Sequence, residues 1–169
     1  MLPRVVSGLL LRKAWPNTRG RVGGLPLDSE VEVARDQWGI PHISVRTVHD
    51  LFCAQGYVHA QDRLWQMETL RRLAEGRLSE IADTRAVPLD WLARMSGMPE
   101  MKRRAAAGMS DEEHGHCQAY AEGVNACVRA MGRRLPLEFS SMKFSPDPWT
   151  AGDCTSPLPY LAFTQMFFP

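Results

Sequence analysis

Four side chains in the first half of the chain have the types and spacing that could carry chemistry: His42, His49, His59 and Asp62. An imidazole can act as a general base or bind a metal, and a carboxylate can orient it or share the metal. His42 lies in a predicted strand, and the sequence assigns it no neighbouring nucleophile or carboxylate. We therefore interpret His42 as a structural residue at a sheet edge.

A metal site built from His49, His59 and Asp62 conflicts with helical geometry. His59 and Asp62 are spaced i,i+3 and share a helix face, but His49 lies ten positions before His59. Ten residues turn a helix by about 1000°, which leaves His49 roughly 80° off the shared face. We expect no metal bound by this chain.

The charged residues of the same predicted helix favour a structural role. Glu68 is spaced i,i+3 from Arg71 and i,i+4 from Arg72, and such pairs stabilise a helix by a few tenths of a kcal/mol. With Asp62 and Arg63 they predict one buried ion network. Polar groups buried in this way need partners, so we expect the helix to lie under another large surface that this chain does not contain.

Nucleophile motifs are missing from the sequence. It contains no GxSxG elbow, no phosphate-binding glycine loop and no HExxH, and no serine or threonine has an assignable neighbouring base. The cysteines form no CxxC or Cys/His cluster, and we interpret them as buried free thiols: Cys53, Cys117, Cys127 and Cys154. We therefore assign no catalytic, cofactor-binding or metal-binding residue to this chain.

Composition is that of one ordinary globular domain. The 169 residues carry a formal net charge of +1 and are 44% hydrophobic, which argues against a nucleic-acid or membrane-surface partner. No apolar run reaches the roughly 18 residues of a membrane span, and the N-terminal residues are not identified as a signal peptide. We expect a poorly ordered segment over 1–28 and a domain over 29–169.

The elements that must position these side chains begin with a strand pair over 30–45. Period-2 alternation predicts the strands, and Asp36 and Gly39 supply the turn between them. Thr47 then opens a long helix as its N-cap, with Asp50 reaching back as in a capping box, and Gly76 ends it. The predicted fold class is helix-rich α+β.

The second half of the chain is predicted to contain shorter helices. One is predicted over 89–95, and Pro99 opens another that ends near Gly108. A clean amphipathic helix then runs from a capping box at Ser110 to Gly132. A further helix start is predicted at 150–153. Pro157 and Pro159 follow within one turn, and because an interior proline costs about 3 kcal/mol, we expect them to break that helix.

Residues of the first half of the chain, taken in their order along the sequence, resemble the N-terminal α-subunit signature of the penicillin acylase family. The resemblance is carried by Val33, Arg35-Asp36, Gly39-Ile40-Pro41-His42-Ile43, Asp50-Leu51, Gly56-Tyr57-Val58, Ala60-Gln61-Asp62-Arg63-Leu64, Gln66-Met67-Glu68, Arg71-Arg72 and Gly76. It continues with Tyr120-Ala121, Gly123-Val124-Asn125, Pro136, Glu138-Phe139, Pro148-Trp149 and Asp153. The pattern GxPHI followed by GYxxAQDRLxQME is long and specific.

This resemblance implies part of an N-terminal-nucleophile (αββα) amidohydrolase acting on acyl amides or N-acyl substrates. Such enzymes are made as one precursor that cleaves itself, and the serine that begins the β-subunit attacks the amide with its own α-amine as base. The resemblance also implies that the nucleophile, the oxyanion-hole groups and any calcium ligands lie outside this chain, which stops where the α-subunit should continue. For the whole enzyme it implies the bacterial periplasm.

Two hypotheses of different classes follow. In the first, the chain is part of the α-subunit of such a hydrolase, inactive without its β-subunit and prone to aggregate or stay molten by itself. In the second, it is a non-catalytic helical binding or assembly module that melts cooperatively when expressed alone.

Overall fold

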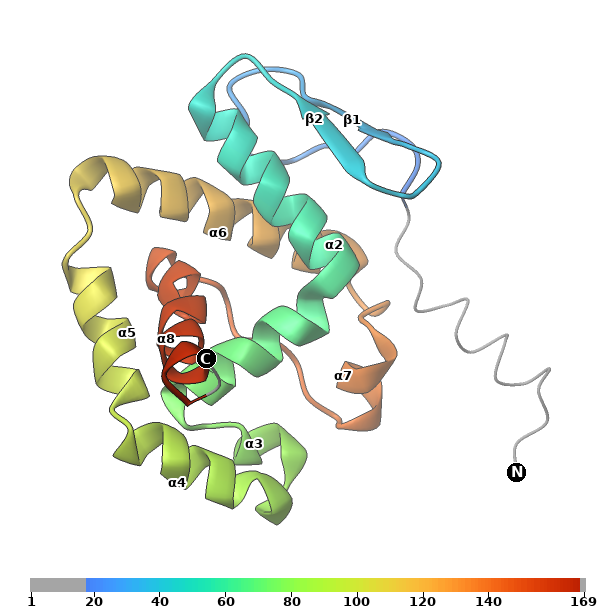
Figure 1. The fold of residues 1–169 in the computed structure, drawn as a ribbon. Coiled ribbons are helices and arrows are strands. Elements are labelled where there is room, and N and C mark those ends of the chain that lie inside the picture. Colours follow the sequence, from blue (N-terminus) through green and yellow to red (C-terminus); the bar gives the residue numbers. More distant parts are fainter. Residues whose placement is uncertain (1–17, 168–169) are drawn as a thin grey trace, which may run out of the picture.

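In the computed structural model the described residues are 18–167, and they form a helix-rich α+β fold (Figure 1). The helices and strands occur in the order β1 (Glu32–Arg35), β2 (Pro41–Ser44), α2 (Val48–Glu75), α3 (Ser79–Ala82), η1 (Thr84–Ala86), α4 (Val87–Met95), α5 (Met98–Ala107), α6 (Asp111–Met131), α7 (Leu137–Ser141), η2 (Ala151–Thr155) and α8 (Pro157–Phe167), where η marks a 3-10 helix. The predicted strand pair followed by long helices is confirmed. Most of the segment predicted to be poorly ordered, residues 1–17, lies outside the described residues.

The two strands form an antiparallel hairpin with the predicted turn. The Asp36 carboxylate accepts hydrogen bonds from the backbone N–H groups of Trp38 and Ile40, each at 2.9 Å. Gly39 has φ 78°, a left-handed conformation that costs a glycine little. His42 sits in β2, with its Nε2 3.4 Å from the other Asp36 oxygen on the exposed side of the turn.

Helix α2 begins as predicted, but the predicted capping box is only half formed. The Thr47 hydroxyl accepts from the Asp50 N–H at 3.1 Å. The Asp50 carboxylate does not reach back, because it accepts instead from the N–H groups of Asp28 and Ser29 and from the Ser29 hydroxyl. Asp50 thus fastens the segment before the hairpin to the first turn of α2. Gly76 ends the helix at φ 63°, as predicted.

A kink divides α2 into two halves, and the sequence did not predict it. Arg63 has φ −140° and ψ 23°, outside the helical region. Figure 1 shows the half before the kink crossing α6, and the half after it turning toward α3, α4 and α5. The two halves of this one helix therefore pack against different parts of the protein.

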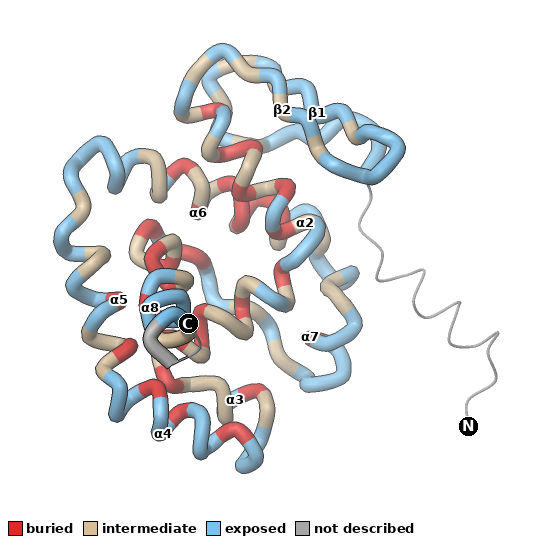
Figure 2. Tube along the Cα trace, in the orientation of Figure 1, coloured by how far each residue is buried: buried red, intermediate tan, exposed pale blue. Residues whose placement is uncertain are grey.

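The crossing of α2 and α6 is unusually close because a glycine lies on each helix. A Cβ added at Gly56 would lie 2.1 Å from the backbone oxygen of Tyr120, and one at Gly123 would lie 1.9 Å from that of Cys53. The core cluster grows around this crossing and consists of Ala60, Leu64, Ala121, Val124, Cys127, Phe139 and Trp149. Most buried residues belong to the helices, many of them at this crossing, while the hairpin is mostly exposed (Figure 2).

The helix that starts at 150–153 ends at Thr155, ahead of Pro157 and Pro159 as expected, but the two prolines do not end the helical structure of the chain. Asp153 accepts from the Thr150 N–H and hydroxyl, both at 2.9 Å, and so starts η2. Helix α8 then begins at Pro157 itself. Both prolines fall in its first turn, where backbone N–H groups have no partner within the helix, so neither proline removes a hydrogen bond. None of the helices in residues 18–167 is long and apolar enough to span a membrane.

Candidate functional site

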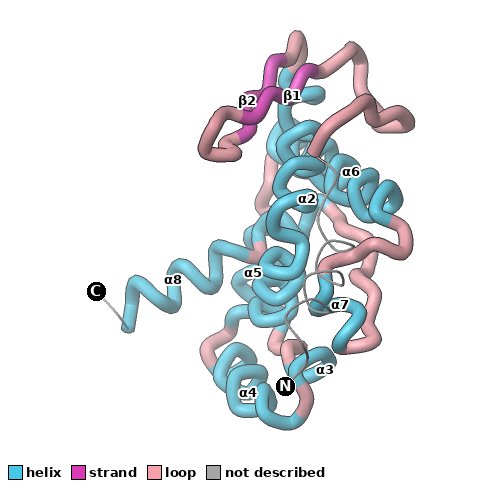
Figure 3. The backbone as a smooth tube through the Cα atoms, turned by 90° about the vertical axis from the view of Figure 1, so that its right-hand side faces the viewer, coloured by secondary structure: helices cyan, strands magenta, loops and turns pink. Residues whose placement is uncertain are grey.

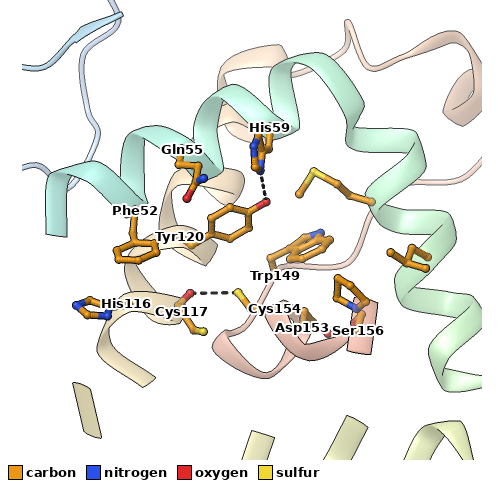
Figure 4. A pocket seen from close by; sticks show the side chains of 13 residues that line it. Phe52, Gln55, His59, His116, Cys117, Tyr120, Trp149, Asp153, Cys154 and Ser156 are labelled. Carbon is orange, nitrogen blue, oxygen red and sulfur yellow. Dashed lines mark hydrogen bonds between the residues drawn. The ribbon is translucent and has the colours of Figure 1, made fainter. Parts of the chain in front are cut away.

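An open, largely apolar cleft of about 330 Å³ lies where α2, α6 and the η2–α8 segment meet. Figure 4 shows its walls: Phe52, Gln55 and His59 extend from α2, while Tyr120 extends from α6. Trp149 comes from the loop before η2. The cleft is within the size range of small-molecule sites, and it is the candidate functional site of the described residues.

A hydrogen-bonded pair of rings spans the α2 and α6 walls of the cleft. The His59 Nδ1 lies 2.9 Å from the Tyr120 hydroxyl, and the rings meet edge to face. Partial desolvation lowers the pKa of His59, and the Asp62 carboxylate only partly offsets this. Burial also raises the pKa of Tyr120. Both groups are therefore neutral at neutral pH, so the pair offers hydrogen bonds rather than charge.

Two buried polar atoms of the cleft-lining residues have no hydrogen-bond partner among the described residues. They are the indole Nε1 of Trp149 and the hydroxyl of Ser156, whose residues are 7% and 1% exposed. An unpaired buried donor costs about 1–3 kcal/mol, and both atoms are closed off from solvent. The mainly apolar lining suits a mainly apolar group, and the His59–Tyr120 pair is a polar feature of the wall.

A buried ionic cluster connects α2 to α5 and η2 beside the cleft. Glu68, which is fully buried, binds Arg71 and also Arg72, the latter at 2.7 Å. Arg71 continues to Asp153 at 3.4 Å, and Asp153 accepts from Lys102 at 2.7 Å. The cluster fixes η2, and with it the end wall of the cleft, to the second half of α2.

This cluster corrects two expectations. The predicted single network of the α2 charges is divided, because Asp62 pairs instead with Arg35 of β1 and Arg63 bonds Gln66 at 3.0 Å. The buried charges of α2 also find their partners inside this chain. Glu68 therefore needs no covering surface from outside, contrary to the prediction for this helix.

The histidines weighed as metal ligands have separate partners. His59 bonds Tyr120, while the Nδ1 of His49 lies 3.6 Å from Asp50 and 3.8 Å from Asp28. His49, Asp28 and Asp50 bring ligand atoms within 4.8 Å of one another, a grouping that sequence spacing did not suggest. The Asp50 carboxylate already accepts from the N–H groups of Asp28 and Ser29, so we interpret the group as a structural junction between that segment and the first turn of α2.

The cysteines also depart in part from the prediction of buried thiols. All four are free, but only two of them are buried, at 0% and 1% exposure: Cys53 and Cys127. Cys117 and Cys154 are partly exposed and line the cleft. Sequence reasoning missed the cleft because its walls come from three segments that no periodic pattern connects.

The fold has a solved counterpart among acylases. The thermostable penicillin G acylase from Alcaligenes faecalis matches it with a TM-score of 0.68 and 31% identity, over 82% of this chain and 74% of that chain. The model of the penicillin amidase family matches residues 30–167. The chain belongs to the penicillin amidase family.

Curated relatives agree with this assignment. The chain is 41% identical over 139 residues to the penicillin acylase 2 proenzyme of Pseudomonas sp. (strain SE83) and 36% identical over 129 residues to the penicillin G acylase of Escherichia coli. It is 34% identical over 139 residues to the acyl-homoserine lactone acylase QuiP of Pseudomonas putida. These matches cover 82%, 74% and 82% of the chain but only 18%, 15% and 17% of the relatives.

Proposed function

We propose that this chain is the N-terminal part of the α-subunit of a penicillin-acylase-type amidohydrolase with an N-terminal-nucleophile fold. The enzyme would hydrolyse the amide bond of an acyl amide or N-acyl substrate. The observation that carries the proposal is the family match over residues 30–167, together with alignments that cover less than a fifth of the length of the curated relatives. Alone, the chain would be inactive.

The division of labour follows from the chemistry that amide hydrolysis needs. A hydroxyl becomes a good nucleophile when an adjacent base takes its proton, and a serine at a chain terminus can use its own α-amine. Donors placed around the developing oxyanion then lower the barrier. We propose that a β-subunit supplies these groups, while this chain supplies the scaffold and the apolar cleft.

Exposed apolar side chains support a large covering partner. Helix α8 projects away from the other helices (Figure 3), and Leu158, Tyr160 and Leu161 are 53%, 39% and 52% exposed. On the hairpin, Trp38 and Ile40 are 79% and 55% exposed. Exposed groups of large apolar residues mark interaction surfaces, and the hairpin and α8 would each pack against the remaining polypeptide.

A chimeric proenzyme tests the proposal. Residues 30–167 of this chain would replace the matching segment of the Pseudomonas sp. (strain SE83) proenzyme, with the corresponding Escherichia coli segment as a matched control. We expect the chimera to be processed into two subunits on a gel and to release acid from a chromogenic acyl amide. The isolated chain should show no turnover above buffer.

Two results would contradict the proposal. One is turnover by the isolated chain that a single substitution within it abolishes, since the nucleophile would then lie here. The other is a chimera that remains unprocessed and inactive while the control chimera matures, since this segment would then lack the scaffold function.

A further inference from the structure

Two thiols meet at the wall of the cleft. Cys117 is on α6 and Cys154 is in η2, and the Cys154 thiol donates to the Cys117 backbone oxygen at 3.6 Å (Figure 4). Both cysteines are partly exposed and line an open cleft, so a small reagent can reach them. The other two, Cys53 and Cys127, are closed off from solvent.

We propose that Cys117 and Cys154 form a redox-active pair that a small-molecule disulfide converts to an intramolecular disulfide. A bond needs Cα atoms within about 7 Å, and the 3.6 Å contact of the Cys154 thiol with the Cys117 backbone oxygen makes the two residues direct neighbours. The residues are 37 positions apart, so the bond would close a loop through α7 and tie η2 to α6.

Thiol–disulfide exchange supplies the balanced chemistry. The Cys117 thiolate attacks one sulfur of oxidised glutathione, which forms a mixed disulfide and releases one glutathione. The Cys154 thiol then loses its proton and attacks the Cys117 sulfur, which forms the protein disulfide and releases the second glutathione. The two cysteines lose two electrons and two protons, and oxidised glutathione becomes two molecules of reduced glutathione.

The order of the two steps has a physical reason. Burial, reinforced by the neighbouring Cys117 thiol, raises the pKa of Cys154 to about 12. Cys154 therefore stays protonated at neutral pH and is the slower nucleophile. We assign the first attack to Cys117, and because closure needs the Cys154 thiol to lose its proton, closure should accelerate as the pH rises.

The disulfide would have a structural consequence for the cleft. η2 forms its end wall and leads directly into α8. Fixing η2 to α6 restricts the opening of the cleft and the direction in which α8 leaves the helices. Because a cross-link constrains the unfolded chain, the oxidised form should also melt higher than the reduced form, by about 5–15 °C.

Mass spectrometry of the purified chain tests the inference without any hydrolysis assay. The reduced chain is incubated with oxidised glutathione at pH 8, alkylated with N-ethylmaleimide, digested and analysed by fragmentation. We expect a Cys117–Cys154 cross-link that dithiothreitol reverses and a loss of about 2 Da from the intact chain. Cys154→Ser should stop at a glutathione adduct on Cys117, and Cys117→Ser should form little adduct, because Cys154 stays protonated.

Cys127→Ala is the matched control, because Cys127 lies on α6 but is buried, and this variant should form the cross-link as the wild type does. The inference is overturned if wild-type chain yields only glutathione adducts, no oxidation or intermolecular dimers. A cross-link to Cys53 or Cys127 also overturns it. None of these results bears on the proposed hydrolase function, which the chimera tests separately.

Discussion

Replacing Gly123 by alanine should separate α2 from α6. The added Cβ would lie 1.9 Å from the Cys53 backbone oxygen, whereas ordinary van der Waals contact begins at 3.4 Å. The obstacle is backbone, so no side chain can rotate out of the way. The two helices must therefore move apart by about 1.5 Å, a gap that forfeits more than half of the dispersion energy along their contact.

The cost can be set against the helix propensity that alanine gains. Overpacking of a core typically costs about 1–3 kcal/mol, and a clash between backbones belongs at the upper end or above it. Alanine in a helix gains about 1 kcal/mol over glycine. We therefore expect Gly123→Ala to lower the free energy of unfolding by about 2–3 kcal/mol, which corresponds to a Tm lower by about 4–12 °C.

Gly115→Ala on the same helix isolates the propensity effect, because a Cβ there meets nothing within 4 Å. That variant should be stabilised by up to about 1 kcal/mol. Urea unfolding followed by circular dichroism measures both. Gly56→Ala obstructs the same crossing, at 2.1 Å from the Tyr120 oxygen, so the double variant with Gly123→Ala should lose less than the sum. Equal stability of the Gly123→Ala and Gly115→Ala chains would refute the reasoning.

Three further predictions concern the ionic cluster and α8. Glu68→Gln removes the shared partner of two buried arginines, so the free energy of unfolding should fall by about 3–5 kcal/mol in urea titration. Glu100→Ala, which breaks an exposed ion pair, should change it little. Burial raises the pKa of Asp153, but hydrogen bonds from Lys102 and Thr150 lower it by more than burial raises it. The net pKa therefore lies below the ordinary 3.8. Its stabilisation is therefore present above about pH 4 and lost as the pH falls through the folded pKa, so Asp153→Asn should lose less stability than wild type between pH 5 and pH 3 in urea titrations. Leu161→Pro, at the fifth residue of α8, should cost about 3 kcal/mol and reduce the helical circular dichroism signal, whereas Leu161→Ala at the same exposed position should be tolerated.

Each of these predictions has an opposing result. A Glu68→Gln chain as stable as Glu100→Ala would show that the cluster is not the junction between α2 and η2. Parallel acid profiles of wild type and Asp153→Asn would assign the acid sensitivity to other carboxylates. Full helicity of Leu161→Pro would mean that α8 does not continue as a regular helix past its first turn.

Local sequence determined most of the elements of this protein. The turn at Asp36 and Gly39, the cap at Thr47 and the stops at Gly76 and Gly132 each depend on neighbours within a few positions, and the structure confirms all four. The family resemblance was also legible in the residues themselves. These features could be predicted because backbone hydrogen bonds at turns and helix ends are satisfied locally.

Only tertiary structure decided which partner each polar residue has. The kink at Arg63 was not foreseen, and the engagement of Asp50 by residues before the hairpin and the pairing of Arg71 with Asp153 depend on segments distant in sequence. The same holds for the cleft and for the meeting of Cys117 with Cys154. A helical pattern fixes which side chains share a face, but the contact across that face depends on how whole helices pack, and here two glycines allow α2 and α6 to touch.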